Sequence, residues 1–139
     1  MQGAGRARFW GRVVAVWLAI LLLAILNGAL REAVLLPAWG RPAALVASGV
    51  LLAILILAAA LASSRWIGAA STACAWRVGL AWLALTLAFE FTFGALVQGK
   101  TWPQLLAAYA MRDGNLWPLV LLVTLAAPVL ARRLRVGAE

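Results

Sequence analysis

The sequence contains no histidine, a single cysteine and only four acidic residues, and each shortage excludes a class of function. Without histidine, the chain lacks the commonest general base and a principal ligand of zinc and haem iron. Cys74 has no second cysteine with which to form a disulfide, and we expect it to be a small packing residue. We therefore predict no catalytic residue, no metal site and no cofactor.

Charged residues of either sign are also scarce. They make up 12% of the chain, against about 25% in soluble domains, while 66% of the residues are hydrophobic and the mean hydropathy is +1.01. This composition is typical of a protein whose solvent is lipid. The net charge of +8 does not indicate nucleic-acid binding, because the basic residues lie at the ends of apolar segments and do not line one face. The lipid bilayer is the first predicted partner, and nucleic acid is not expected to be one.

Long apolar runs, by contrast, are abundant. Four segments are long enough to cross a hydrocarbon core of about 30 Å, at about residues 9–36, 43–62, 73–97 and 116–134. The run from Val13 to Leu30 is longer than the hydrophobic region of a secretory signal, so we interpret it as an uncleaved first span. Before the fourth span, Thr101-Trp102-Pro103-Gln104 matches a capping box with proline at the helix start. This motif predicts a short amphipathic interfacial helix over about residues 102–112.

The fold class predicted from these segments is an all-α membrane protein. We expect one transmembrane domain, residues 1–139, built as an antiparallel four-transmembrane-helix bundle with the interfacial helix before the fourth span. Eight basic residues lie at the two ends of the chain or near the loop between the second and third spans, and four lie on the other side. Because cytoplasmic loops carry the excess of lysine and arginine, we predict a multi-pass protein of the bacterial inner membrane with cytoplasmic N- and C-termini.

Polar residues inside the predicted spans converge on one depth. Asn27 and Arg31 share a face of the first helix at i and i+4, and Ser48 falls in the outer half of the second helix. Glu90 lies about 21 Å along the third helix from its cytoplasmic start. A carboxylate at that depth is costly without a partner, so we predict a buried ion pair between Arg31 and Glu90.

Further polar residues extend this predicted pocket in the outer half of the membrane. Glu32 offers a second acceptor for Arg31, and Thr86 lies on the same helical stripe as Glu90. The helix at 102–112 is expected either to cover the pocket as a lid or to act only as an interfacial anchor. The predicted ligand-binding residues are Asn27, Arg31, Glu32, Ser48, Thr86, Glu90 and Tyr109.

Three segments carry a likeness to known sequences. They are Asn27-Gly28-x-x-Arg31-Glu32, then Phe89-Glu90-Phe91-x-Phe93-Gly94, and Tyr109 followed by Gly114-x-Leu116-Trp117. In these segments the chain resembles a group of small uncharacterised bacterial four-helix inner-membrane proteins. The resemblance covers most of the chain and implies the four-helix membrane fold, but it implies no activity.

Several functions are open at this point. In the first, the pocket binds a small polar ligand, an ion or a lipid headgroup, with or without transport. In the second, the chain is an accessory subunit or assembly factor of a larger membrane complex, and Arg31 with Glu90 only fixes the helix register. An intramembrane enzyme that uses Glu90 as acid or base is the least favoured. Besides the bilayer, the predicted partners are further copies of the chain in a homo-oligomer or other subunits of a membrane complex.

Overall fold

The computed structural model describes residues 2–107, 109 and 115–138, and every element in these residues is a helix. The all-α prediction is therefore confirmed for this part of the chain. The helices overlap the ranges that the apolar runs predict, but α1 begins at Gln2 instead of about residue 9 and α3 ends at Ile67 instead of about residue 62. Two short π-helical segments lie at the ends of α-helices. In chain order they are α1 (Gln2–Leu30), the π-helix η1 (Arg31–Leu35), α2 (Leu36–Trp39), α3 (Arg41–Ile67), α4 (Thr72–Thr92), the π-helix η2 (Phe93–Val97), α5 (Trp102–Ala107) and α6 (Trp117–Ala138).

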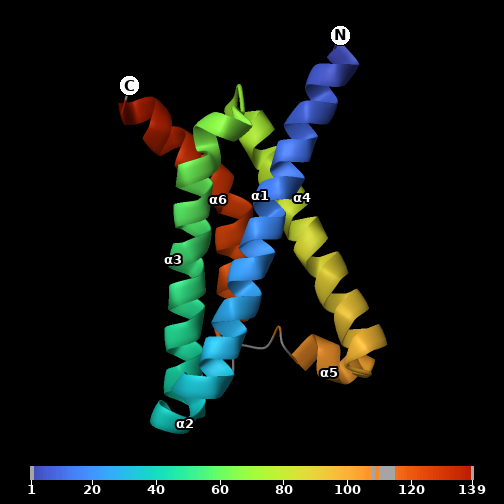
Figure 1. The fold of residues 1–139 in the computed structure, drawn as a ribbon, viewed down its shortest axis with the longest axis vertical. Coiled ribbons are helices and arrows are strands. Elements are labelled where there is room, and N and C mark those ends of the chain that lie inside the picture. The colour runs from blue at the N-terminus through green and yellow to red at the C-terminus, as the bar shows by residue number, and fades with distance from the viewer. Residues whose placement is uncertain (1, 108, 110–114, 139) are drawn as a thin grey trace.

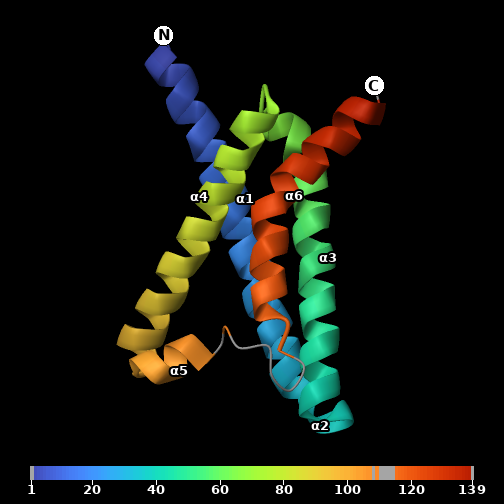
Figure 2. The same ribbon diagram turned by 180° about the vertical axis from the view of Figure 1, so that it is seen from behind.

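Three helical segments are long and apolar enough to cross a membrane: Gly3–Trp39, Arg41–Ile67 and Thr72–Val97. This finding supports the prediction of a membrane protein with transmembrane helices. The fourth predicted span corresponds to α6, which lies beside α3 and α4 in both views (Figures 1 and 2). The N- and C-termini lie at the same end of the molecule, opposite α2 and α5 (Figure 1).

Glycine and proline set the connections between these helices. Gly40 ends α2 at φ 81°, a backbone conformation that favours glycine. Pro42 follows in the first turn of α3, where a backbone N–H would have no hydrogen-bond partner within the helix, so its absence in proline costs nothing. Gly68 ends α3 in the left-handed conformation. The Ser71 hydroxyl then accepts the Cys74 backbone N–H at 3.1 Å and caps α4. The turn from α3 to α4 is accordingly short.

The core is built from the facing sides of α1, α3, α4 and α6, with α6 packed between α3 and α4. Trp82, Val78 and Val120 are among the largest side chains that are fully buried. At Gly79, a Cβ atom would collide with the backbone of Leu125, so α4 and α6 touch through their main chains at this point. The small residue permits a closer approach than any side chain would.

Helices α1 and α4 form a wedge. Near the end that carries the termini they are joined by two indole hydrogen bonds, from Trp82 Nε1 to the Val13 carbonyl and from Trp17 Nε1 to Thr86 Oγ1, each 3.0 Å long. Beyond these bonds α4 leans away toward α5, while α1 stays beside α3 (Figures 1 and 2). The wedge therefore widens toward the end opposite the termini.

Candidate cavity at the wide end of the wedge

A cavity of about 660 Å³ lies at the wide end of this wedge, with walls from α1, α3, α4, α5 and α6. Its volume is in the range of about 300–1,000 Å³ that is typical of sites for one small ligand. Five of the seven residues predicted from the sequence line it, whereas Glu32 and Tyr109 are not among its lining residues. The five are Asn27, Arg31, Ser48, Thr86 and Glu90.

Asn27 and Ser48 form the most buried polar contact of the cavity. They are 3% and 1% exposed, and they join α1 to α3. The Asn27 Nδ2 donates to the Ser48 carbonyl at 3.2 Å, and the Ser48 hydroxyl donates to Asn27 Oδ1 at 2.5 Å. Both side chains thus satisfy each other, which is the requirement for polar groups removed from water. This pair mainly holds the two helices together, and it presents little free hydrogen-bonding capacity to a ligand.

Arg31 lies at the edge of the cavity with a different partner from the one predicted. Its Nε is 3.4 Å from Glu32 Oε1, and its Nη1 is 3.5 Å from the Ser48 hydroxyl. No ion pair joins Arg31 to Glu90, although the structure describes both residues. The prediction of that pair was based on equal depth along two helices. Because α1 and α4 diverge here, the two side chains lie on opposite walls of the cavity.

The backbone at Arg31 departs from a regular α-helix. The Leu36 N–H donates to the Arg31 carbonyl, five residues back, so a π-helical turn connects α1 to α2. Pro37 follows directly, and its ring would clash with the carbonyl four residues before it, which accounts for the wider turn. Such turns interrupt α-helices frequently at functional sites. Here the turn places Arg31 at the point where α1 leaves the cavity.

The opposite wall is built around Glu90 on α4. Lys100 is the charged group that acts most strongly on the half-buried Glu90 carboxylate. The Trp117 indole N–H lies near this carboxylate and near the Tyr109 hydroxyl, and its nitrogen is buried with no hydrogen bond of good geometry to a described residue. The Tyr109 hydroxyl is likewise buried and without a partner among the described residues. Two polar hydrogens near Glu90 therefore remain available to a ligand.

Tyr109 belongs to this wall although it does not line the cavity. Its ring stacks on Phe91 with centroids 5.8 Å apart and planes 7° from parallel. Burial raises the pKa of the Tyr109 hydroxyl above its usual value, and the nearby negative charge of Glu90 raises this pKa further. The phenol is consequently a neutral hydrogen-bond donor throughout the physiological pH range.

Helix α5 closes the far side of the wedge. The Thr101 backbone N–H donates to Gln104 Oε1 at 2.9 Å, as the capping-box motif predicts. Phe91 contacts Trp102 with ring centroids 5.7 Å apart, and the Leu105 side chain packs over Gly94. A helix is thus present from Trp102 to Ala107, within the range predicted for the interfacial helix. Most of its predicted continuation, residues 108 and 110–112, lies outside the described residues.

Sequence reasoning missed several polar residues of the cavity. Arg41 and Lys100 stand at helix ends and look like ordinary topology signals in the sequence, and the tryptophan at 117 looks like a belt residue. These three residues line one cavity only because of the angles at which the helices cross. Besides the five predicted residues, the polar lining includes Arg41, Lys100, Gln104, Asn115, Trp117 and Thr124.

The charges around the cavity are unbalanced. Three cationic side chains line it, from Arg31, Arg41 and Lys100, against the single carboxylate of Glu90. Glu32 compensates Arg31 from outside the lining, at an exposed position. The remaining excess is positive, and a cavity with low-dielectric walls concentrates such a field. The charges that line the cavity therefore favour a negatively charged ligand.

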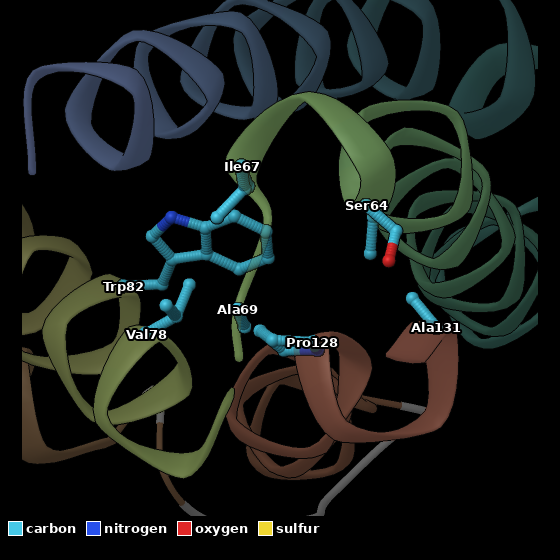
Figure 3. Close-up of a pocket in the computed structure, with 8 residues that line it drawn as sticks. Ser64, Ile67, Ala69, Val78, Trp82, Pro128 and Ala131 are labelled. Atoms are coloured by element: carbon cyan, nitrogen blue, oxygen red, sulfur yellow. The ribbon is translucent and has the colours of Figure 1, made fainter. Parts of the chain in front are cut away.

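A second hollow lies near the termini and is too small for a ligand (Figure 3). Its volume is about 10 Å³, room for one water at most. Its walls are mainly apolar, from Trp82, Val78, Pro128 and neighbouring residues, as the close-up shows. We attribute it to imperfect packing around Trp82.

Metal ligands do not gather in the part of the chain that the structure describes, where no three His, Cys, Asp or Glu residues come together. Comparisons of the chain with protein-family models, with curated proteins and with solved structures find no match.

Proposed function

We propose that this chain is a four-span protein of the bacterial inner membrane that binds a small anionic ligand in the cavity at the wide end of its wedge. The observation that carries the proposal is the lining of the cavity, where three cations face one carboxylate and two buried donors nearby have no hydrogen-bond partner in the described part of the chain. Arginine and lysine at the mouth supply charge-assisted hydrogen bonds, which are the stronger kind.

Helix α6 supplies the fourth span in this proposal. Its 22 residues rise about 33 Å and its apolar part, residues 117–131, about 22 Å, so in this proposal the arginine side chains that follow extend from the end of the core to the interface. It is buried against α3 and α4 through Val120, Thr124 and Ala127. In its last two turns, Arg132 and Arg135 each donate a hydrogen bond to the Ala69 carbonyl at 3.3 Å. An apolar helix that ends in anchored cations is typical of a membrane span.

The orientation of the protein is also proposed, with both termini in the cytoplasm. The termini share one end of the molecule (Figure 1), where the basic residues of the N-terminal segment and of the α6 end are concentrated. The cavity lies at the other end, and would open on the outer half of the bilayer. This orientation is tested by fusing to the C-terminus a reporter that is active only in the cytoplasm, and we expect the fusion to be active.

Ligand binding is tested on the full chain in detergent micelles. Thermal unfolding is measured with inorganic phosphate, with glycerol phosphate and with phosphatidylglycerol, because a ligand at a hundredfold excess over its Kd stabilises the folded state by about 2.7 kcal/mol. We expect at least one of these anions to raise Tm in the unmodified protein and in Arg8→Ala, a control at the other end of α1, but not in Arg31→Ala. The proposal is wrong if no anion stabilises the protein or if both variants respond equally.

The accessory-subunit function stays a competing prediction. This function would be supported if other membrane proteins co-purify with the chain in fixed stoichiometry in mild detergent. They should then also co-purify with the Arg31→Ala variant. The same experiment would then separate a scaffold from a ligand-binding protein.

A further inference from the structure

We infer that the ligand of the cavity is an amphipathic anion, namely a membrane lipid with an anionic phosphate headgroup. It would enter laterally from the bilayer, between α1 and α4. This inference depends on the proposed function, since it names the chemical class of the ligand at the same site. Three features of the described residues carry it: the division of the cavity into an apolar and a charged half, its length, and the side on which it opens.

The cavity is divided along its length. Its narrow half, next to the Trp17–Thr86 hydrogen bond, is lined by apolar side chains such as Ile20, Leu52 and Ile56. All of its charged lining residues lie in the wide half. A small inorganic anion would use only the charged half, whereas a lipid would place its headgroup there and a chain in the apolar half. Burying a chain in that half keeps apolar surfaces together.

The length of the cavity matches a lipid chain. From Trp17 to Arg31, both of which line it, α1 rises about 21 Å. One leaflet contributes about 15 Å of a hydrocarbon core that is about 30 Å thick. A cavity about 21 Å long therefore has room for an acyl chain of the outer leaflet together with its headgroup.

The cavity also opens toward the membrane and not only toward water. Ile25 lines it and is nevertheless 52% exposed, so the cavity reaches the surface of α1 at that height. Helices α1 and α4 both contribute lining residues and diverge at this height, and both belong to segments able to span the membrane. A side opening between two spans faces hydrocarbon, which gives lipids direct access to it.

Phosphate is the headgroup chemistry that the mouth fits best. The guanidinium groups of Arg31 and Arg41 can each hold two phosphate oxygens at once, and Lys100 adds a point charge. The two buried donors near Glu90, Tyr109 Oη and Trp117 Nε1, supply further hydrogen bonds for a hydroxyl or a phosphate oxygen. A zwitterionic headgroup would bring a second, positive charge against this cationic wall, which disfavours it.

The inference is tested by native mass spectrometry of the full chain with three probes: phosphatidylglycerol, phosphatidylcholine and water-soluble glycerol phosphate. We expect phosphatidylglycerol to bind at least about tenfold more tightly than either other probe. In Arg31→Gln its affinity should fall by about tenfold or more, the loss of one charge-assisted hydrogen bond. Arg8→Gln, a charge removed from the other end of α1, should leave it unchanged.

A second pair of variants tests the apolar half. Ala24→Trp fills the cavity between Ile20 and Asn27, and Ala19→Trp places the same side chain on an exposed part of α1 outside the lining. We expect Ala24→Trp to lose at least about tenfold in phosphatidylglycerol affinity and Ala19→Trp to retain it. If Ala24→Trp aggregates, Ala24→Leu is measured in its place, with the same expectation at a smaller loss.

The outcomes separate the inference from the proposed function. If glycerol phosphate binds as tightly as phosphatidylglycerol and Ala24→Trp binds like Ala19→Trp, the lipid inference is wrong and anion binding stands. If phosphatidylcholine binds as tightly as phosphatidylglycerol, the preference of the mouth for an anionic over a zwitterionic headgroup is wrong. If no probe binds, both the inference and the proposed function fail.

Discussion

Asn27 and Ser48 hydrogen-bond to each other in both directions across the contact of α1 with α3. Each is almost completely buried, so neither can exchange its partner for water. This contact fixes the height of α1 against α3 at the level where the cavity opens. Arg31, one turn further along, is 3.5 Å from the same serine hydroxyl and takes its position from this clamp.

The clamp leads to the first prediction, on stability. Asn27→Ala leaves the Ser48 hydroxyl and carbonyl without their partner, and we expect a loss of about 1–3 kcal/mol in the free energy of unfolding. Ser48→Ala should cost a similar amount, and the double variant should cost less than the sum because both changes remove one interaction. Ser63→Ala is the control, since its hydroxyl donates only within its own helix, to the Ala59 carbonyl at 2.7 Å. Unfolding in mixed micelles measures all four.

The close approach of α4 and α6 leads to the second prediction. A Cβ at position 79 would collide with the Leu125 backbone, which cannot rotate away as a side chain can. Gly79→Ala should therefore separate the two helices and destabilise the protein by about 1–3 kcal/mol. Gly11→Ala is the matched control, because nothing lies within 4 Å of its Cβ position. That variant should instead stabilise α1 by about 0.5–1 kcal/mol, so Tm should move in opposite directions, and equal shifts would contradict the packing.

A third prediction concerns the narrow end of the wedge. Trp17→Phe keeps most of the ring but removes the hydrogen bond to Thr86 Oγ1, and should cost about 0.5–1.5 kcal/mol. Thr86→Val removes the other partner. A double-mutant cycle should give a coupling free energy in this range. The control cycle pairs Trp17→Phe with Thr124→Val, whose hydroxyl donates within its own helix to Val120. Coupling of equal size in both cycles would contradict a specific Trp17–Thr86 contact.

The fold was more predictable from the sequence than the site, for a physical reason. The number of apolar residues and the rise of 1.5 Å per residue determine helix length and the depth of a side chain along its helix. The sequence therefore placed Asn27 and Ser48 at one level, where the structure joins them. Depth says nothing about crossing angle. The predicted Arg31–Glu90 pair is not confirmed: Arg31 pairs with Glu32 instead, because α1 and α4 diverge at this depth and no local pattern in the sequence encodes that divergence.

The residues that sequence reasoning missed follow from the same limit. Arg41 and Lys100 come from two different helix ends, far apart in the sequence, and they line one cavity only because the chain folds back at Gly40 and closes through α5. The signal that could have found them is the cluster of basic residues on the side that should carry few of them.

The last prediction concerns pH and uses the fact that Tyr109 is the single tyrosine of the chain. Because burial and the charge of Glu90 raise the pKa of Tyr109 in the folded protein, the unfolded chain releases this proton first as the pH rises. Stability should thus be retained below the ordinary tyrosine pKa of about 10 and should fall as the pH rises from there through the folded pKa. Ultraviolet absorbance of the tyrosinate reports this group alone.

Glu90→Gln should shift the titration of Tyr109 to lower pH, because it removes the second cause of the raised pKa. The control is Glu32→Gln, which removes an exposed carboxylate that pairs with Arg31 outside the cavity lining and should leave the titration unchanged. Equal titrations in the unmodified protein and in Glu90→Gln would show that Glu90 and Tyr109 do not share one wall of the cavity.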